Sequence, residues 1–219
     1  MAEAVVFDMD GVIVDTEQYW VEEEGEILAR ALPEGHDVDP HDITGINVHE
    51  QYALLAESYE MQVDQEAYFE LFDSCAERVY ERADLLSGFH DLLDAIETRE
   101  RPIGLATSSY PRWIEIVFDR HDLDGRFDEV LSAADLDAPG KPEPDIYESV
   151  AERLGVAPER LVVAEDSENG IAAAAAAGAY TIAYAPDGEG DATDRSPADE
   201  VVGSPEALRD RILARLDAN

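Results

Sequence analysis

Four carboxylates in this sequence are placed where they could act together. Asp8 and Asp10 follow a short apolar run near the N-terminus, and Glu165 and Asp166 follow a second apolar run much later. A cluster of carboxylate oxygens with no His or Cys partner suits Mg²⁺. A carboxylate can also attack phosphorus, and a second carboxyl two residues away can protonate the leaving oxygen and later deprotonate a water.

Hydroxyl and ammonium donors occur in matching positions. Thr107 and Ser108 follow a third apolar run, and Lys141 lies in a Gly-Lys-Pro loop. Such donors would bind the equatorial oxygens of a phosphoryl group in transfer. Lys141 is the only lysine among fifteen basic residues, although one lysine surviving by chance is the alternative. An Asp after a strand is usually a turn former, so the argument rests on the whole set converging.

Alternating strands and helices explain how these residues would meet. Strands alternating with helices predict a mostly parallel sheet with helices on both faces, and ligands bind at the carboxyl ends of such strands. The expected strands are 4–7, 102–106, 129–132, 161–164, 180–185 and 200–202. The expected helices are 89–97, 113–120, 145–154, 171–177 and 205–216.

A different pattern separates the first strand from the second. Between Asp15 and Ala83 the apolar spacing is helical, with expected helices at 19–31, 50–59 and 65–82 and no β-branched run. This block predicts a helical insertion into the α/β domain.

The charge restricts the possible partners. Fifty-two Asp and Glu face fifteen Lys and Arg, for a net charge of -37, so a nucleic-acid partner is not expected. Hydrophobic residues make up 45%, which argues against a disordered acidic chain and favours a folded protein with an acidic surface, as in salt-loving organisms. No apolar run is long enough to span a bilayer, no signal-peptide pattern is present, and Cys75 is the only cysteine. We therefore expect a cytoplasmic protein without a membrane partner.

Four segments together resemble the motifs of the haloacid dehalogenase (HAD) superfamily. In chain order they are DMDGVIVDTE from Asp8, ATSS from Ala106, GKPEPD from Gly140 and AEDSENGI from Ala164. The resemblance covers nearly the whole chain. It implies a Rossmann-like α/β core formed by residues 1–15 and 84–219, with an α-helical cap domain at 16–83.

The resemblance also implies roles for the motif residues. Asp8 would be the nucleophile and a metal ligand, and Asp10 the general acid/base with its carbonyl on the metal. Lys141 would neutralise the phosphate and Asp8. Thr107 and Ser108 would bind the phosphate. Asp166, together with Glu165, would complete the Mg²⁺ site. The implied substrate is a small phosphorylated metabolite, of the phosphoglycolate or sugar-phosphate type.

Within the superfamily, several reactions are separated by single residues. Asp10 argues against carbon–halogen cleavage, which needs no protonated leaving oxygen. The absence of lysine from 16–83 argues against a Schiff-base phosphonoacetaldehyde hydrolase. Hexose-phosphate mutases of the β-phosphoglucomutase kind carry a histidine about where this chain has Trp20 and an arginine near Val48. Both departures favour a phosphatase, and a mutase is the first alternative. The second alternative is a catalytically silent, acidic binding protein on the same fold.

Three cap residues are candidates for substrate selectivity. Trp20 could line a pocket, although an aromatic residue at a helix start is more often part of the core. Asn47 and His49 could contact substrate, although a surface histidine is the more ordinary interpretation. We expect a monomer or a weak homodimer.

Overall fold

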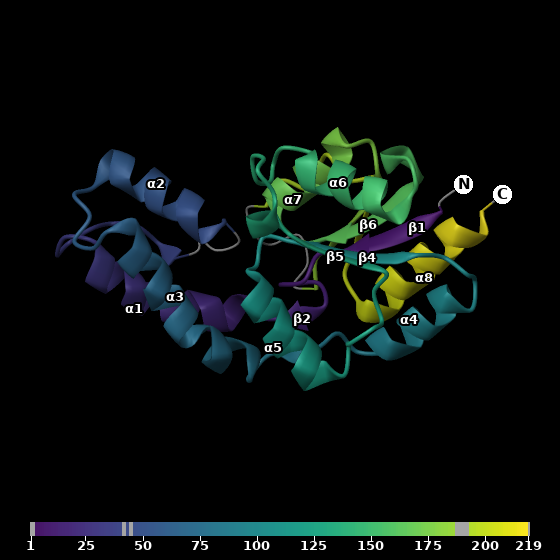
Figure 1. Cartoon of the computed structure of the whole chain (residues 1–219), viewed down its shortest axis with the longest axis horizontal. Helices are drawn as coiled ribbons and strands as arrows, with labels where there is room; N and C mark the ends of the chain where they lie inside the picture. Colours follow the sequence, from purple (N-terminus) through teal and green to yellow (C-terminus); the bar gives the residue numbers. More distant parts are fainter. Residues whose placement is uncertain (1–2, 41–42, 44–45, 187–192, 219) are drawn as a thin grey trace.

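The central element of the protein is a six-stranded parallel sheet (Figure 1). The computed structural model describes residues 3–40, 43, 46–186 and 193–218. The strand order is β5-β4-β1-β6-β7-β8, and every pairing between these neighbours is parallel. The strands are β1 (Ala4–Phe7), β4 (Ile103–Thr107), β5 (Glu129–Ser132), β6 (Leu161–Glu165), β7 (Tyr180–Tyr184) and β8 (Glu200–Val202). The predicted α/β class is confirmed.

Helices cover both faces of this sheet because its strands are apolar on both sides. Along β1, Val5 and Phe7 join one buried cluster, and Ala4 and Val6 join the other. In Figure 1, α6 and α7 lie above the sheet, and α4 and α8 lie below it. The helices of this part are α4 (Phe89–Glu97), α5 (Pro111–His121), α6 (Asp145–Leu154), α7 (Glu168–Ala176) and α8 (Pro205–Asp217).

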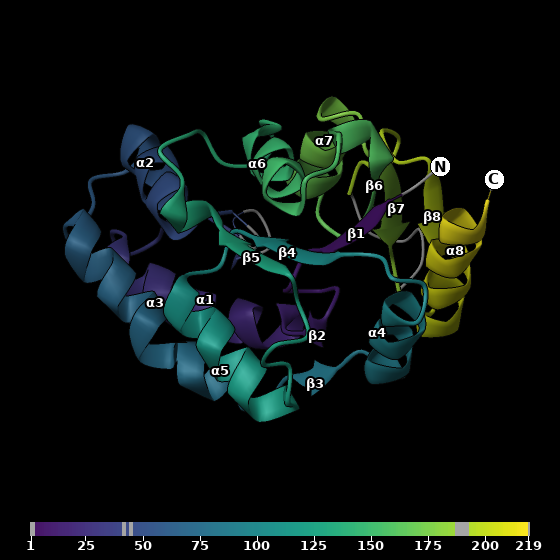
Figure 2. The ribbon, with the colours of Figure 1, turned by 45° about the vertical axis from the view of Figure 1, so that its right-hand side comes forward.

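Three more helices form a separate layer beyond the sheet, which we call the cap: α1 (Glu17–Ala31), α2 (Val48–Ser58) and α3 (Gln65–Tyr80). Helix α3 lies beside α5 in both ribbon views (Figure 2). The chain enters and leaves the cap through a short antiparallel pair, β2 (Val14–Asp15) and β3 (Asp84–Leu85). Sequence analysis did not predict this pair, because strands of two residues show no periodicity. The predicted cap domain, residues 16–83, begins directly after β2 and ends directly before β3. Its status as a separate domain stays a prediction.

Local capping accounts for two of the four helix starts that differ from the expected ones. Helix α2 begins at Val48 because the Asn47 side chain accepts a hydrogen bond from the His49 amide at 3.0 Å. Ser167 caps α7 in the same way through the Gly170 amide at 3.1 Å, so α7 begins three residues before its predicted start. Among the described residues, no helix is both long and apolar enough to cross a membrane.

Candidate active site

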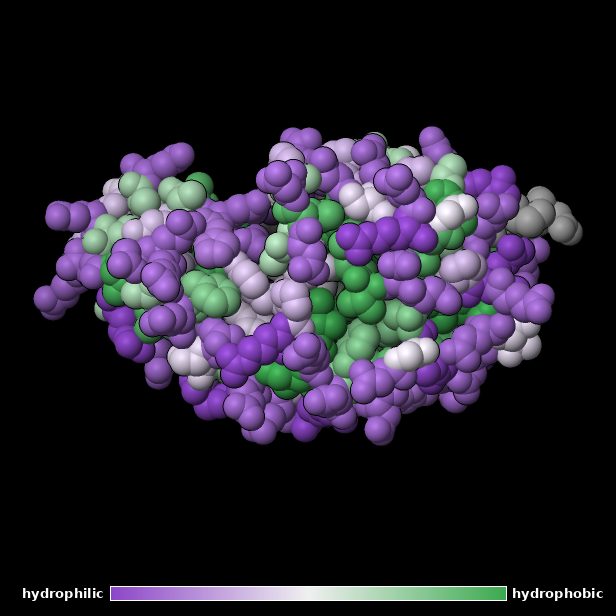
Figure 3. Space-filling model, in the orientation of Figure 1, coloured by the Kyte–Doolittle hydropathy of each residue, from purple (hydrophilic) through white to green (hydrophobic). Residues whose placement is uncertain are grey.

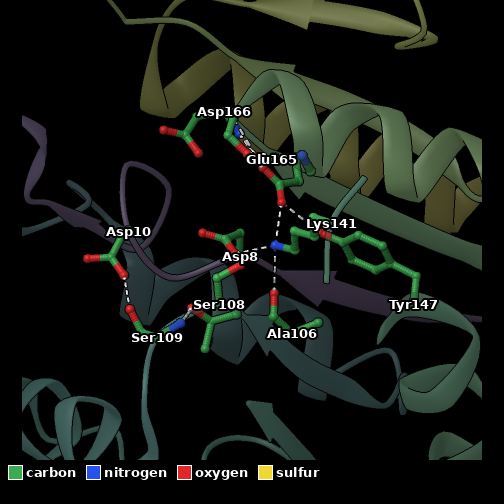
Figure 4. A network of polar contacts seen from close by, with 12 residues as sticks. Asp8, Asp10, Ala106, Ser108, Ser109, Lys141, Tyr147, Glu165 and Asp166 are labelled. Carbon is green, nitrogen blue, oxygen red and sulfur yellow. Dashed lines mark hydrogen bonds and ion pairs between the residues drawn. The ribbon is translucent and has the colours of Figure 1, made fainter. Parts of the chain in front are cut away.

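Strand β1 carries Asp8 to the centre of the sheet's carboxyl edge. The Asp8 amide continues the strand pairing by donating to the Ala164 carbonyl at 3.0 Å. Thr107 ends β4 on one side of β1, and Glu165 ends β6 on the other. Because neighbouring parallel strands end at the same edge, residues from three distant segments meet there (Figure 4).

Lys141 joins two of these carboxylates. Its Nζ donates to Asp8 Oδ1 at 2.6 Å and to Glu165 Oε1 at 2.6 Å, and it also reaches the Ala106 carbonyl at 3.2 Å (Figure 4). Burial opposes the charged ammonium, but Asp8 and Glu165 together outweigh burial and raise the pKa of Lys141 well above its usual value. Lys141 therefore stays positively charged at neutral pH.

Glu165 has partners for both of its oxygens. Its Oε1 accepts from Lys141 and, at 2.8 Å, from the Tyr147 hydroxyl. Its Oε2 accepts from the Asp166 amide at 3.0 Å and from Ser167. A Cβ on Gly170 would lie 1.8 Å from Glu165 Oε1, so glycine is needed there. Glu165 thus holds both Lys141 and the turn that leads into α7.

A group of carboxylates at this edge fits a metal ion. One oxygen each from Asp8, Glu165 and Asp166 lies within 4.8 Å of the others. Burial, opposed by Lys141, raises the pKa of Asp8 to about 7. Burial and the charges of Glu165 and Asp8 raise the pKa of Asp166 well above its usual value. The protein alone therefore disfavours full ionisation of the group, and a cation would remove that penalty. Hard oxygen donors of this kind match Mg²⁺.

Asp10 occupies a different environment, in a cage of hydroxyl groups. Its Oδ1 accepts from Thr16 at 2.8 Å, and its Oδ2 accepts from Ser109 at 2.6 Å and from Tyr80 at 3.3 Å. Burial raises the pKa of Asp10 above its usual value despite these hydrogen bonds and one from Trp20. The raised pKa favours a carboxyl group that can hold a proton and deliver it.

Sequence analysis gave no role to the cage residues. Thr16 and Ser109 lie inside the quoted motifs, and their hydroxyl groups were the available signal. Tyr80 gave no signal, because it is 70 residues from Asp10 in the chain and reaches it only through the packing of the cap.

The predicted phosphate-binding residues also lie at this edge. Thr107 is buried, and its hydroxyl oxygen accepts from the Ser109 amide at 3.0 Å. The Ser108 carbonyl accepts from the Asn47 side chain at 3.4 Å, which links the cap to the core. Both Thr107 and Ser108 line a cavity of about 920 Å³ that also reaches Asp8, Asp10, Lys141 and Asp166.

The three cap residues that are candidates for substrate selectivity differ in whether they line the cavity. Trp20 and Asn47 line the cavity. Trp20 is also part of the core, since it is 7% exposed and packs against Trp113 at a ring distance of 5.3 Å. His49 is exposed, stacks on Phe69 at 5.7 Å and is not among the described residues that line the cavity. The structure therefore gives His49 no contact with the cavity.

Comparisons with known proteins identify the family of the chain. Residues 2–178 match the family model of the haloacid dehalogenase-like hydrolases. The chain is 36% identical over 180 residues to a phosphorylated carbohydrates phosphatase of Thermotoga maritima, covering 80% of this chain and 82% of that one. It is 30% identical over 195 residues to hexitol phosphatase B of Escherichia coli (strain K12), covering 86% of each.

Solved structures show the same fold. The β-phosphoglucomutase of Clostridium difficile superposes with a TM-score of 0.80 at 24% identity, over 99% of this chain and 98% of that one. The family match covers more than half of the chain, and the two relatives named above are both phosphatases. The chain therefore belongs to the haloacid dehalogenase-like hydrolases and is a phosphatase of that family.

Proposed function

We propose that the protein hydrolyses a small phosphomonoester in two steps through a phosphoryl group carried on Asp8. The observation that carries this proposal is the contrast between the two carboxylates of the first motif. Asp8 accepts a hydrogen bond from the charged Lys141, whereas the hydrogen bonds to Asp10 come from uncharged hydroxyl groups, and burial raises the pKa of Asp10 despite them. A nucleophile and a general acid need this difference.

In the first step, an Asp8 carboxylate oxygen forms a bond to phosphorus, and the bond from phosphorus to the substrate oxygen breaks. Asp10 gives its proton to that leaving oxygen. In the second step, Asp10 takes a proton from water, and the water oxygen displaces Asp8 and releases phosphate. Lys141, Thr107 and Ser108 would donate hydrogen bonds to the phosphoryl oxygens throughout.

We further propose that Asp8, Asp166, Glu165 and the Asp10 carbonyl hold Mg²⁺. The ion would offset the repulsion between the carboxylates and a phosphate dianion. Glycine at position 11 supports this role, because a Cβ there would lie 1.8 Å from Asp166 Oδ2. The Gly11 backbone therefore lies directly against the Asp166 carboxylate, one oxygen of which is within 4.8 Å of oxygens of Asp8 and Glu165.

Two alternatives make different predictions. A mutase of the β-phosphoglucomutase kind would convert a hexose 1-phosphate into a 6-phosphate without releasing phosphate. Trp20, which stands where such mutases carry a histidine, packs against Trp113 and Tyr80 and has no titratable group. A silent binding protein would release no phosphate from any ester. The complete set of Asp8, Asp10 and Lys141 argues against that alternative.

The test is phosphate release from a panel of small phosphomonoesters, including sugar phosphates and phosphoglycolate, with Mg²⁺ in molar KCl. We expect turnover that stops in excess EDTA and returns with Mg²⁺. Asp8→Asn should abolish turnover, because an amide is a far poorer nucleophile than a carboxylate. Asp91→Asn, which alters an exposed residue of α4, is the matched control and should keep full activity.

Mass spectrometry should verify that the introduced asparagine has not deamidated back to aspartate. Substantial turnover by an intact Asp8→Asn protein would rule out the covalent route. Full turnover in EDTA would remove the metal site from the proposal.

A further inference from the structure

One side of α1 extends the cavity away from the reacting groups. Glu17, Trp20 and Glu24 all line the cavity, and their spacing of three and four residues places them along one side of the helix. Trp20 is the middle member of this row and lies close to Asp10, since a hydrogen bond from Trp20 is one of the influences on the pKa of Asp10. Glu24 lies one turn further on, about 6 Å along the helix axis at 1.5 Å per residue.

Glu24 is a buried carboxylate held in place by the other cap helices. It is 2% exposed, and its Oε1 accepts from Gln51 Nε2 at 3.4 Å. The Gln51 amide is itself fixed, because it donates to the carbonyls of Ile43 and Ile46 at 2.9 and 3.0 Å and accepts from Tyr68 at 3.1 Å. This network fixes Gln51 in one orientation and places Glu24 at the cap end of the cavity.

The described cavity lining from the cap contains no cation. The cap arginines that pair with acids do so on other surfaces, as in Arg78 with Glu23 and Arg82 with Glu22, and none of the cap arginines lines the cavity. The cations in the described lining are Lys141 and Arg195, and both belong to segments outside the cap. An anionic group that extended from Asp10 toward Glu24 would therefore meet a carboxyl group and, among the described cap residues that line the cavity, no cation.

The direction of the leaving group follows from the proposed chemistry. Asp10 must contact the oxygen that leaves, so the organic part of the substrate lies on the Asp10 side of the phosphoryl group. From there, the described cavity wall offers the Trp20 ring and then Glu24. An aromatic face followed by a carboxylate suits a chain of C–H and O–H groups, because a carboxylate accepts several hydrogen bonds from hydroxyls.

We propose that Glu24 determines specificity by accepting hydrogen bonds from hydroxyl groups of an uncharged, polyhydroxylated leaving group and by repelling a second anionic group. The substrate class is accordingly a sugar or polyol monophosphate, and phosphorylated acids and bisphosphates are rejected. Specificity of this kind combines an attractive contact with a repulsive one. The inference rests on the proposed phosphatase function and narrows its substrate.

A matched pair of substrates tests the inference directly. Sorbitol 6-phosphate and 6-phosphogluconate have the same carbon chain and differ by a terminal alcohol or carboxylate. We expect the wild-type kcat/KM, measured by phosphate release with Mg²⁺, to be at least about tenfold higher for the alcohol, because one like charge nearby has an effect of that order or more. p-Nitrophenyl phosphate, which has neither group, reports on the chemistry alone.

Three variants locate the effect. Glu24→Gln should raise kcat/KM for the acid and bring the ratio toward one, whereas Glu24→Asp should keep the charge and the preference. Glu26→Gln, an exposed residue of the same helix, removes an equal charge away from the cavity and should leave the ratio unchanged. If Glu24→Gln does not fold, the wild-type and Glu24→Asp ratios still decide.

The outcomes separate the two proposals. Equal rates on the alcohol and the acid by wild type, or a preference unchanged in folded Glu24→Gln, would overturn the role of Glu24 and leave the phosphatase intact. Loss of activity on all three esters, including p-nitrophenyl phosphate, would instead count against the proposed function itself.

Discussion

At the scale of single residues, Lys141 uses one nitrogen to contact three acceptors. Its Nζ reaches Asp8, Glu165 and the Ala106 carbonyl, and its side chain is 5% exposed. An ammonium is a compact point charge with three donors, whereas a guanidinium is a wide planar fork that prefers a bidentate partner. The other fourteen basic residues are all arginines, so the composition alone would have favoured arginine here as well.

We predict that Lys141→Arg is nearly as damaging as Lys141→Ala. Both should lower kcat/KM by about a hundredfold or more, which is the usual effect of losing one preorganised donor in an active site. The arginine fork should displace either the phosphate or Asp8. Measurement of kcat/KM for both variants on the best substrate decides the point, with Arg101→Lys as a control outside the site. Near-wild-type activity of Lys141→Arg would contradict the geometric argument.

Tyr80 is a positioning residue, because it contacts Asp10 and Ser109 and not the reacting atoms. Tyr80→Phe should lower kcat/KM up to about tenfold for alkyl phosphates, since a single hydrogen bond contributes about 0.5–1.5 kcal/mol. p-Nitrophenyl phosphate should be affected much less, because its leaving group needs no proton. A purely structural role would lower both rates equally.

The matched control for this prediction is Tyr59→Phe. It also removes a tyrosine–aspartate hydrogen bond, to Asp37, but within the cap. We expect this variant to behave as wild type with both substrates. A similar loss in both tyrosine variants would show that cap stability, and not the position of Asp10, determines the rate.

At the scale of elements, the loops that follow the strands depend on glycine for the close approach of carboxylates. Gly11 follows β1 in a left-handed conformation, with φ of 76°, and a Cβ there would lie 1.8 Å from Asp166 Oδ2. The loop after β1 and the loop after β6 can therefore approach each other only without a side chain at position 11.

Gly11→Ala should weaken Mg²⁺ binding as well as stability, because Asp166 must move. The control is Gly35→Ala, which has a φ of 87° and no neighbouring atom within 4 Å of the added Cβ. Both should lose about 1–2 kcal/mol of stability from the left-handed backbone. Only Gly11→Ala should require more Mg²⁺ for half-maximal activity. Equal Mg²⁺ requirements in the two variants would show that Gly11→Ala acts only through backbone strain and not through the position of Asp166.

At the scale of the whole molecule, excess negative charge covers a compact apolar core. Hydrophilic residues cover most of the face in Figure 3, and the net charge is -37. Exposed ion pairs such as Arg82 with Glu22 contribute little to stability and cannot offset this excess. Self-repulsion of the folded state should therefore be relieved mainly by dissolved salt.

We predict that the melting temperature rises clearly with KCl. The Debye length falls from about 10 Å at 0.1 M to about 3 Å at 1 M, so most of the rise should occur within this range. Thermal melts across a KCl series would show it. A flat response would contradict the salt-adapted surface, and a rise that continued linearly far above 1 M would indicate ion exclusion in place of screening.

Much of this molecule is determined locally, and the sequence was sufficient for that part. The order of strands and helices, the helical insertion and the positions of Asp8, Thr107, Lys141 and Asp166 follow from apolar periodicity, from turn residues and from motif spacing. Each of these signals acts over a few neighbouring residues. The α4 and α6 ranges, for example, match their predicted bounds.

Only the tertiary structure decided which side chains meet across those elements. Tyr80 and Ser109 reach Asp10 from 70 and 99 residues away, Glu24 reaches the cavity, and His49 does not line it. Such contacts depend on how the cap packs against the core and on side-chain direction, and no local pattern encodes either. The core residues of the site can thus be identified from the motifs, whereas the contacts that surround Asp10 depend on packing between the cap and the core.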